Sequence, residues 1–287
     1  MENVKNTTLS FTLPEAWQEG DFFGCASLGF AGVRGEEKMT FAHTPQGIVL
    51  SGGYQKILAE AKGLSPKAAL VFFGNAGGEN RFLRELYSLL RCPMVGGGAA
   101  MNGTVGGLIT GGAEACVFLL TDENYKVETE YQNIHRHELG TVKVDFDEAD
   151  PRTVTAIDGQ EPKAWLDGQK AALGFSSEDF EHFTLSDLKG VNAHLSFDGK
   201  NVLSGRDLEH EMIARYVLPE EVYPSVFPFY NDGENAIVPG CAGLKGICGE
   251  LAPVASLGLY LFGEVCMTES GPEFGNLMLS KIRFIKK

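Results

Sequence analysis

The pattern of apolar and polar positions is clearest between residues 68 and 101, where it predicts a strand, a helix and a second strand. Residues 69–73 form an uninterrupted apolar run, which is too short for an exposed helix and is typical of a strand buried on both faces. Residues 80–90 carry apolar side chains at helical spacing. Pro93 ends this helix, and residues 94–95 begin the second strand. The pattern indicates a strand-helix-strand unit around which the remaining chain is arranged.

Glycines follow both predicted strands of this unit, namely Gly74, Gly77, Gly78, Gly96, Gly97 and Gly98. A strand end without side chains lets a ligand approach the backbone, and the N–H groups at the start of the following helix can bind an anion or a carboxylate. The other interpretation is that these glycines allow tight turns and close packing of the helix on the sheet. The stretch taken alone favours packing.

The same reasoning predicts further elements on both sides of the unit. Apolar runs and alternation predict strands at residues 9–13, 22–30, 47–50, 115–120, 127–134, 141–146, 153–157, 192–197 and 201–203. Residues 54–62 and 162–173 have the pattern of helices. The second helix has Pro162 in its first turn, Asp158 as its expected cap and Gly174 at its exit.

The plan of the strand-helix-strand unit recurs near the C-terminus, in residues 236–267. There an apolar strand again ends in glycines, and a second apolar strand again ends at a glycine, Gly263. This predicts an α/β (α+β) fold of two pseudo-duplicated halves, with mixed sheets covered by helices and a layered α/β/β/α sandwich as one arrangement. The halves are expected to be residues 1–150 and 151–287, divided at the acidic segment 147–151, with a cleft between them.

Two further predictions concern the segments 127–146 and 206–216. Strands 127–134 and 141–146 are expected to form part of a meander, and residues 206–216 form an amphipathic segment.

Charge and composition narrow the class of protein. The 287-residue chain has a net charge of −14 and no cluster of basic residues, which argues against nucleic acid as a partner. No apolar run approaches the roughly 20 residues that span a bilayer, and the N-terminus lacks the features of a signal peptide. We therefore expect a cytoplasmic protein with no membrane partner. The six cysteines contain no CxxC pair, so reduced and buried thiols are expected.

Three stretches of the chain carry motifs of a known family. The first unit ends in GGGA at residues 96–99, and the middle of the chain contains VTAIDGQEPKAWL at residues 154–166. The C-terminal stretch contains GCAG at residues 240–243, with Lys245 as the nearest basic residue, and YLFGE at residues 260–264. Together these stretches resemble the FIST family, a bacterial sensory module, in its strand-Asp-Gly-x-Pro-Ala-helix signature, its Cys-Ala-Gly turn and its closing Tyr-x-x-Gly-Glu strand.

The resemblance implies a fold and a function. Residues 1–150 would be a FIST N-like half and residues 151–287 a FIST C-like half. The family is thought to sense small ligands, amino acids being the common proposal, and some members are reported to carry haem. A chain of this length without a kinase or chemoreceptor domain would signal through a protein partner or through oligomerisation.

The expected ligand site combines backbone groups at the strand ends with a few side chains. Backbone N–H groups would take a ligand carboxylate, and Glu264 or Asn276 its amine or hydroxyl. Each side chain also has a structural alternative, because Glu264 can pair with Lys245, Asn276 can stabilise a turn and Asn75 can cap a helix. The candidate ligand-binding residues are Asn75, Gly77, Gly78, Gly96, Gly97, Cys241, Ala242, Gly243, Lys245, Glu264 and Asn276.

Two side-chain sets offer other chemistry. Cys241 would be the nucleophile of a small-molecule hydrolase or transferase if a helix start lowered its pKa, although the sequence ties none of the six histidines to it. His135 and His137 could share a metal or haem, because alternate residues of a strand point to one face. An exposed polar strand end is the simpler interpretation of these histidines, and no cofactor is expected.

The predicted function is a non-catalytic, cytoplasmic sensory module that binds an amino acid or another small carboxylate. A Cys241 enzyme is the alternative. A third possibility is an assembly protein whose glycines serve packing only.

Overall fold

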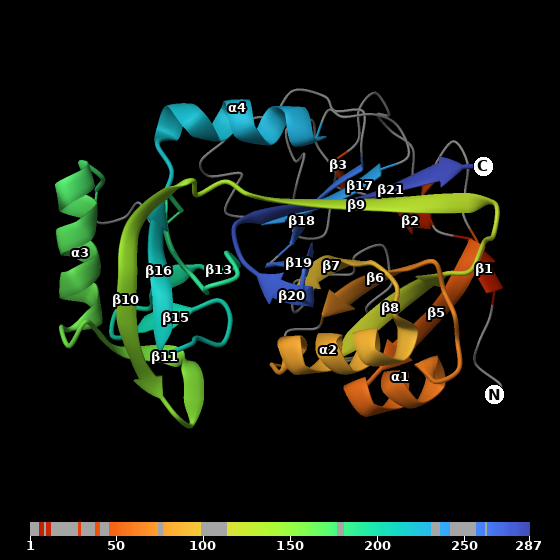
Figure 1. Ribbon diagram of the computed structural model, residues 1–287, viewed down its shortest axis with the longest axis horizontal. Helices are drawn as coiled ribbons and strands as arrows, with labels where there is room; N and C mark the ends of the chain where they lie inside the picture. Colours follow the sequence, from red (N-terminus) through yellow and green to blue (C-terminus); the bar gives the residue numbers. More distant parts are fainter. Residues whose placement is uncertain are drawn as a thin grey trace.

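The computed structural model describes residues 6–8, 10–12, 28–29, 38–40, 46–73, 77–98, 114–176, 181–230, 236–241, 257–261 and 263–287. These residues form a mixed α/β fold with four helices, three larger sheets and one two-stranded sheet (Figure 1). The two-stranded sheet pairs β2 (Ser10–Thr12) with β4 (Lys38–Thr40). Within this described part, none of the helices is long and apolar enough to span a bilayer.

The first sheet contains the predicted strand-helix-strand unit. Its strands, in spatial order, are β1 (Asn6–Thr8), β5 (Gln46–Gly52), β8 (Ala115–Leu120), β6 (Ala68–Phe73), β7 (Met94–Gly98), β19 (Glu264–Thr268) and β20 (Gly271–Gly275). β6 and β7 are parallel, whereas β8 is antiparallel to β6. The helices α1 (Tyr54–Ala61) and α2 (Glu79–Leu90) lie on one face of this sheet (Figure 1). The predicted helix and both predicted strands of the unit are thus confirmed.

The alternation of side chains explains why β6 is buried on both faces. Val71 and Phe73 pack with Phe82 and Leu86 of α2 in one apolar cluster. The residues between them point to the opposite face of the pleated strand, and Phe72 there is also fully buried. The uninterrupted apolar run is therefore needed because both faces of the sheet are covered.

The second sheet covers that opposite face. Its strands, in spatial order, are β3 (Leu28–Gly29), β18 (Leu257–Leu261), β17 (Ala236–Cys241), β21 (Met278–Lys286) and β9 (Tyr125–Asn133). β17 and β21 contact β7 and β19 of the first sheet. The helix α4 (Pro219–Tyr230) lies beside this sheet (Figure 1). The Lys281 ammonium of β21 lies 4.2 Å from the centre of the Phe229 ring of α4. Two helices, two sheets and a further helix thus form the layered arrangement expected from the sequence.

The first two sheets share a local topology. In the first, β6 has the parallel strand β7 on one side and the antiparallel strand β8 on the other. In the second, β17 has the parallel strand β18 on one side and the antiparallel strand β21 on the other. The strands β8 and β21 are the final apolar strands of the two similar stretches of sequence.

A third sheet, absent from the sequence-based expectations, lies beside these layers. Its strands, in spatial order, are β13 (Asn192–Ala193), β12 (Phe183–Ser186), β16 (Glu211–Tyr216), β10 (His137–Asp147), β11 (Asp150–Ile157), β15 (Val202–Ser204) and β14 (Leu195–Phe197). The helix α3 (Pro162–Leu173) packs on it through Trp165 and Leu166. The amphipathic segment 206–216 supplies β16 of this sheet.

The predicted meander is wrong. Residues 127–134 and 141–146 lie on strands as expected, but β9 pairs along its whole length with β21 in the second sheet, and β10 pairs with β11 and β16 in the third. Between them the chain passes His135, whose buried ring bonds the Glu181 carbonyl and the Asn192 side chain. The alternation of apolar and polar residues predicts that a strand forms, but it does not determine which strand lies beside it. The buried contacts of His135 determine the pairing here.

The expected cap of α3 is also wrong. Glu161, directly before Pro162, accepts hydrogen bonds from two N–H groups of the first helical turn. Asp158 lies one turn earlier, with a φ of 50°, and accepts from the Lys143 N–H at 2.8 Å. The helix starts at Pro162 and ends at Gly174 as predicted, so only the residue next to the start can reach its free N–H groups.

The segment expected to divide the halves lies in a hairpin. Asp147 pairs with Asp150, so residues on both sides of the segment belong to one sheet. The C-terminal strands β19 and β20 also complete the first sheet, next to β7. The two sequence halves are therefore interleaved in space.

The backbone around Gly96 leaves no room for a side chain. A Cβ added there would lie 1.8 Å from the Val71 carbonyl oxygen, and the φ of Gly96 is 144°. Gly96→Ala should therefore lower the free energy of unfolding by about 3 kcal/mol or more, as measured by urea denaturation.

Gly168 is the matched control for this substitution. It lies on α3 with no heavy atom within 4 Å of an added Cβ. Gly168→Ala should raise the free energy of unfolding by about 1 kcal/mol, because Ala loses less backbone entropy in a helix. A Gly96→Ala protein as stable as the unmodified one would contradict the geometry.

Candidate functional site

Four strand ends meet around Gly263. β6 and β7 end side by side, because Phe73 pairs with Gly98. β17 and β18 also end side by side, because Cys241 pairs with Leu261. The two parallel pairs are joined where the Gly98 N–H donates to the carbonyl of Gly263 at 3.1 Å.

This convergence creates the position at which α/β sheets bind ligands. Open sheets bind them outside the carboxyl ends of parallel strands, and here the ends of two parallel pairs adjoin. The distance between paired strands and the length of the connecting chain limit the separation of the Cys241 and Gly98 Cα atoms to roughly 17 Å. The structure thus brings Gly96, Gly97, Cys241 and Glu264 to one region of the fold.

The glycines in this region serve close packing. Glu264 pairs with Gly97 and Val265 with Gly96, so β7 lies directly beside β19. A Cβ at Gly263 would lie 2.5 Å from the Phe274 ring and 2.7 Å from the Gly275 carbonyl oxygen. The packing interpretation therefore holds for Gly263, as it does for Gly96.

Glu264 is a buried carboxyl group with one unused oxygen. Its side chain is fully buried at the start of β19, and its Oε2 accepts from the Met278 N–H at 3.0 Å. Its Oε1 has no hydrogen-bond partner among the described residues. Burial raises the pKa of Glu264 well above its ordinary value of 4.5, while the Met278 hydrogen bond lowers it. The folded protein therefore favours the neutral carboxyl.

The surroundings of this carboxyl explain its desolvation. Val265 packs in the apolar cluster beneath α1 and α2, so Glu264 and Cys266 point to the other face of the first sheet. On the strand next to Glu264, a Cβ at Gly275 would lie 2.5 Å from Val191 Cγ1. Burial, reinforced by the Glu264 charge, raises the pKa of the Cys266 thiol well above its ordinary value, although Arg206 lowers it. Cys266 is therefore a poor nucleophile.

Asn276 has a structural role. Its backbone N–H donates to the Asn192 carbonyl at 2.9 Å, and its side-chain oxygen accepts from the His194 N–H at 3.4 Å. Its amide also fills the space that a Cβ at Gly205 would occupy. Asn276 thus joins the end of β20 to the third sheet, which is a structural role of the kind that the sequence offered as the alternative to ligand binding.

A buried polar cluster continues from Asn276 into the third sheet. The side chains of Asn133 and Asn192 exchange hydrogen bonds at 2.8 and 3.0 Å, and Asn192 also bonds the His135 ring at 3.1 Å. Burial lowers the pKa of His135 to about 3 and that of His194 to about 4. Both rings are neutral at pH values near neutrality, and these groups fix the junction between the sheets.

His135 and His137 do not form a shared site. The His135 ring is buried and bonded to Glu181 and Asn192, whereas His137 bonds the Glu221 carboxylate at 2.8 Å and stacks on Tyr216. The expected exposed strand end is thus wrong for His135. No group of three metal-ligating side chains occurs among the described residues.

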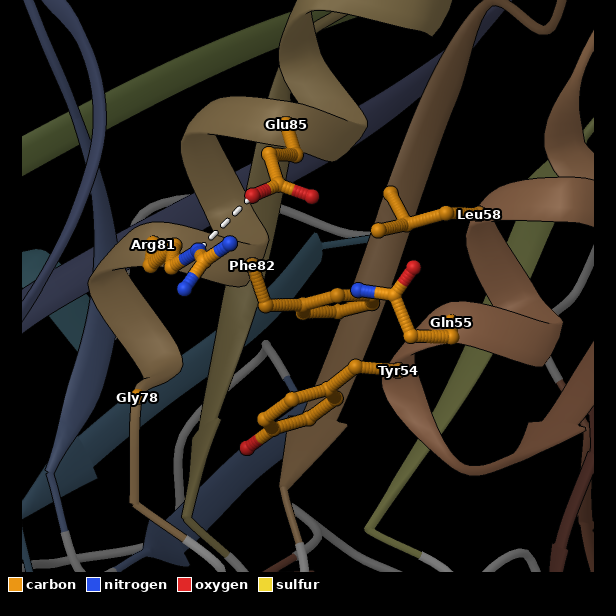
Figure 2. Close-up of a pocket in the computed structure, with 7 residues that line it drawn as sticks. All are labelled: Tyr54, Gln55, Leu58, Gly78, Arg81, Phe82 and Glu85. Carbon is orange, nitrogen blue, oxygen red and sulfur yellow. Dashed lines mark hydrogen bonds and ion pairs between the residues drawn. The ribbon is translucent and has the colours of Figure 1, made fainter.

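Gly78 lines a separate pocket between α1 and α2 (Figure 2). The space measures about 200 Å³ and is bordered by the stacked rings of Tyr54 and Phe82 and by the ion pair of Arg81 with Glu85. Gly77 donates its N–H to the Glu79 side chain at 3.1 Å. The Glu79 carboxylate thus holds the backbone directly before α2.

Glu79 is held in place by Arg152, a residue of the third sheet. The Arg152 guanidinium lies 2.7 Å from its carboxylate, and Glu79 is only 3% exposed. Burial and the nearby charges of Glu79 and Glu114 raise the pKa of Tyr54 far above its ordinary value. These contacts fix the start of α2.

Several candidate residues lie outside the described part of the chain. They are Asn75, Ala242, Gly243 and Lys245, and Cys241 is described only as the last residue of β17. The expected pairing of Glu264 with Lys245 is therefore neither supported nor contradicted. Among the described cysteines, Cys92, Cys116 and Cys266 are buried and free of disulfides, as expected.

Sequence reasoning missed the polar residues that lie between the sheets. Cys266, Asn192, His194 and Arg206 come from strands or turns whose sequences carry no motif. Only the buried position of Cys266, two residues after Glu264 on one strand face, could have been read from the alternation.

Comparison with known proteins adds no family. A scan of the chain against protein-family models found no match, and a search among curated protein sequences found no similar protein. The resemblance to the FIST family therefore stays a prediction that rests on the motifs in the sequence.

The raised pKa of Glu264 predicts how stability depends on pH. The folded state holds this proton more tightly than the unfolded chain, in which the pKa is near 4.5. The resulting stabilisation is complete below that value and is lost as the pH rises toward the folded-state pKa. Glu264→Gln, which cannot ionise, should flatten this slope and be at least as stable as the unmodified protein at about pH 8, as measured by urea unfolding across the pH range.

Glu273 provides the control carboxylate. It is also buried, but the Lys189 ammonium lies 2.6 Å and the Arg84 guanidinium 3.4 Å from it. Glu273→Gln should therefore lower stability near neutral pH by about 1–3 kcal/mol, because it removes a paired charge. Equal pH slopes for Glu264→Gln and the unmodified protein would show that Glu264 ionises normally.

Proposed function

We propose that this protein binds a small polar molecule where the carboxyl ends of β6, β7, β17 and β18 meet, with Glu264 as the recognition group. The observation that carries the proposal is the fully buried Glu264, whose Oε1 has no partner in the described structure. A buried polar atom without a hydrogen bond costs about 1–3 kcal/mol. A ligand that bonds this atom recovers that energy and gains affinity.

The carboxyl limits which ligand groups fit. A ligand ammonium would favour the ionised carboxylate, so Glu264 would release its proton on binding. A ligand hydroxyl can bond the neutral carboxyl without a change of protonation. An amino acid or a small hydroxy acid therefore fits, with its carboxylate toward backbone N–H groups at the strand ends.

The sensory role rests on the motif resemblance. Of the motifs that resemble the FIST family, Gly240 and Cys241 lie at the end of β17, Tyr260 and Leu261 at the end of β18, and Glu264 at the start of β19. Two sheets with the same order of parallel and antiparallel strands support a duplicated ancestry of these parts. We infer a non-catalytic sensory module that passes a binding signal to a protein partner or to a second copy of the chain.

A ligand screen tests the proposed site. The unmodified protein should be stabilised by at least one compound among amino acids, hydroxy acids and other small carboxylates, as measured by thermal shift. Glu264→Gln should weaken binding of that compound at least about tenfold in calorimetry, because a hydrogen bond to a charged or buried carboxyl is lost. Titration in two buffers of different ionisation enthalpy then separates an amine ligand, which releases a proton, from a hydroxyl ligand.

Glu273→Gln serves as the control for binding. Glu273 lies on the adjacent strand, opposite Cys266, and its partners are Lys189 and Arg84. This variant should keep the ligand affinity while losing some stability. A ligand that binds Glu264→Gln as tightly as the unmodified protein would refute the assigned site.

A further inference from the structure

A second pocket lies at the other end of α2, against the hairpin of β19 and β20. It measures about 270 Å³ and is formed by the last two turns of α2, the loop around Lys189 and the tip of the hairpin. None of its lining residues belongs to the site proposed above. Its size matches a small ligand or part of a larger one.

The charge of this pocket is opposite to that of the chain. Three cations, Arg84, Arg91 and Lys189, line it together with one carboxylate, Glu273, in a protein with a net charge of −14. A positive pocket in an acidic protein concentrates anions locally and repels cations. The pocket thus carries a formal charge of two positive units.

Glu273 already shows how an anion is held there. Its carboxylate is buried, with the Lys189 ammonium at 2.6 Å and the Arg84 guanidinium at 3.4 Å. The side chains of Arg84 and Lys189 remain 58% and 39% exposed, so each still has donors that face solvent. The two cations can therefore bind a second anion beside Glu273.

Arg91 supplies the charge that Glu273 does not neutralise. It caps the end of α2, and its guanidinium carbon lies 5.8 Å from the centre of the Tyr87 ring. No carboxylate pairs with it in the described part of the chain. The negative end of the helix amounts to about half a charge, which three full cations outweigh.

The serine hydroxyl groups of the pocket already donate to other groups of the protein, which indicates that charge is the basis of recognition. Ser88 donates its hydroxyl proton to the Glu85 carbonyl at 2.7 Å. Thr268 donates its own proton to the Gly271 carbonyl, so in its contact with Thr268 the Ser270 hydroxyl is the donor. Neither serine has a spare proton for a ligand, so the donors that remain are the guanidinium and ammonium groups and the Tyr87 hydroxyl.

We propose that this pocket binds a small dianion of the phosphate class, as free phosphate or as the phosphate group of a small metabolite. Arg84 and Arg91 provide planar, multiple N–H donors that match the oxygens of a phosphate, and Lys189 provides a compact point charge. The Glu273 carboxylate competes with the bound anion for Arg84 and Lys189. The affinity for phosphate therefore reflects the exchange of these partners.

Inorganic phosphate is the probe for this site. Calorimetry at low ionic strength, with chloride at matched ionic strength as the reference, should detect phosphate binding to the full chain. Arg91→Ala and Arg84→Gln should each weaken it about three- to tenfold, and binding should fall as salt is added. Glu273→Gln should tighten it about fivefold although it destabilises the protein, because a competing carboxylate is removed.

Arg81→Gln is the matched control, because Arg81 lies on the same helix and pairs with Glu85 outside this pocket. It should leave phosphate binding unchanged. Binding of phosphate no stronger than that of chloride would overturn the proposal. An equal loss in Arg81→Gln and Arg91→Ala, or weaker binding in Glu273→Gln, would also overturn it. A phosphate monoester that binds more tightly than inorganic phosphate would identify a metabolite as the source of the anion.

Discussion

The hairpin of β19 and β20 is the constraint on which the arrangement of the sheets depends. It extends the first sheet beside β7, and it also contacts β9, β17 and β21 of the second sheet. Its far strand reaches the third sheet through the Asn276 N–H, which donates to Asn192. Gly275 allows the third sheet to approach this hairpin, since an added Cβ there would lie 2.5 Å from Val191 Cγ1. Gly263, directly before β19, allows the chain to lie against Phe274 and Gly275 of the hairpin.

The same close packing produces the unusual state of Glu264. Both of its cross-strand neighbours, Gly97 and Gly275, lack side chains, and Val191 occupies the space above Gly275. Water is therefore excluded from a carboxyl that has only one hydrogen bond from the described protein. A carboxyl group that is buried with too few hydrogen bonds destabilises a folded protein, and an apolar residue in its place is often at least as stable.

Sequence patterns predicted local structure well and partners poorly. The run 69–73 and the helical spacing of 80–90 identified β6 and α2, because both faces of the strand and one face of the helix are buried. The alternation at 127–134 and 141–146 gave strands but the wrong pairing, since period two does not encode which strand lies beside which. Glu264 stood out as a carboxylate after an apolar strand. Asn192 and His194 did not, because their importance arises from contacts between distant segments.

The loop from Asp187 to Val191 links the two proposed binding regions. Arg206 donates two hydrogen bonds to the Asp187 carboxylate at 3.1 Å and a third to the Val191 carbonyl at 3.3 Å, so the loop is held as one unit. Lys189 in this loop binds Glu273, and Val191 packs over Gly275, two residues further along β20. Lys189 therefore anchors a loop whose other end covers the strand beside Glu264. Because packed segments shift together, the two regions are physically connected through side chains that the structure places in contact.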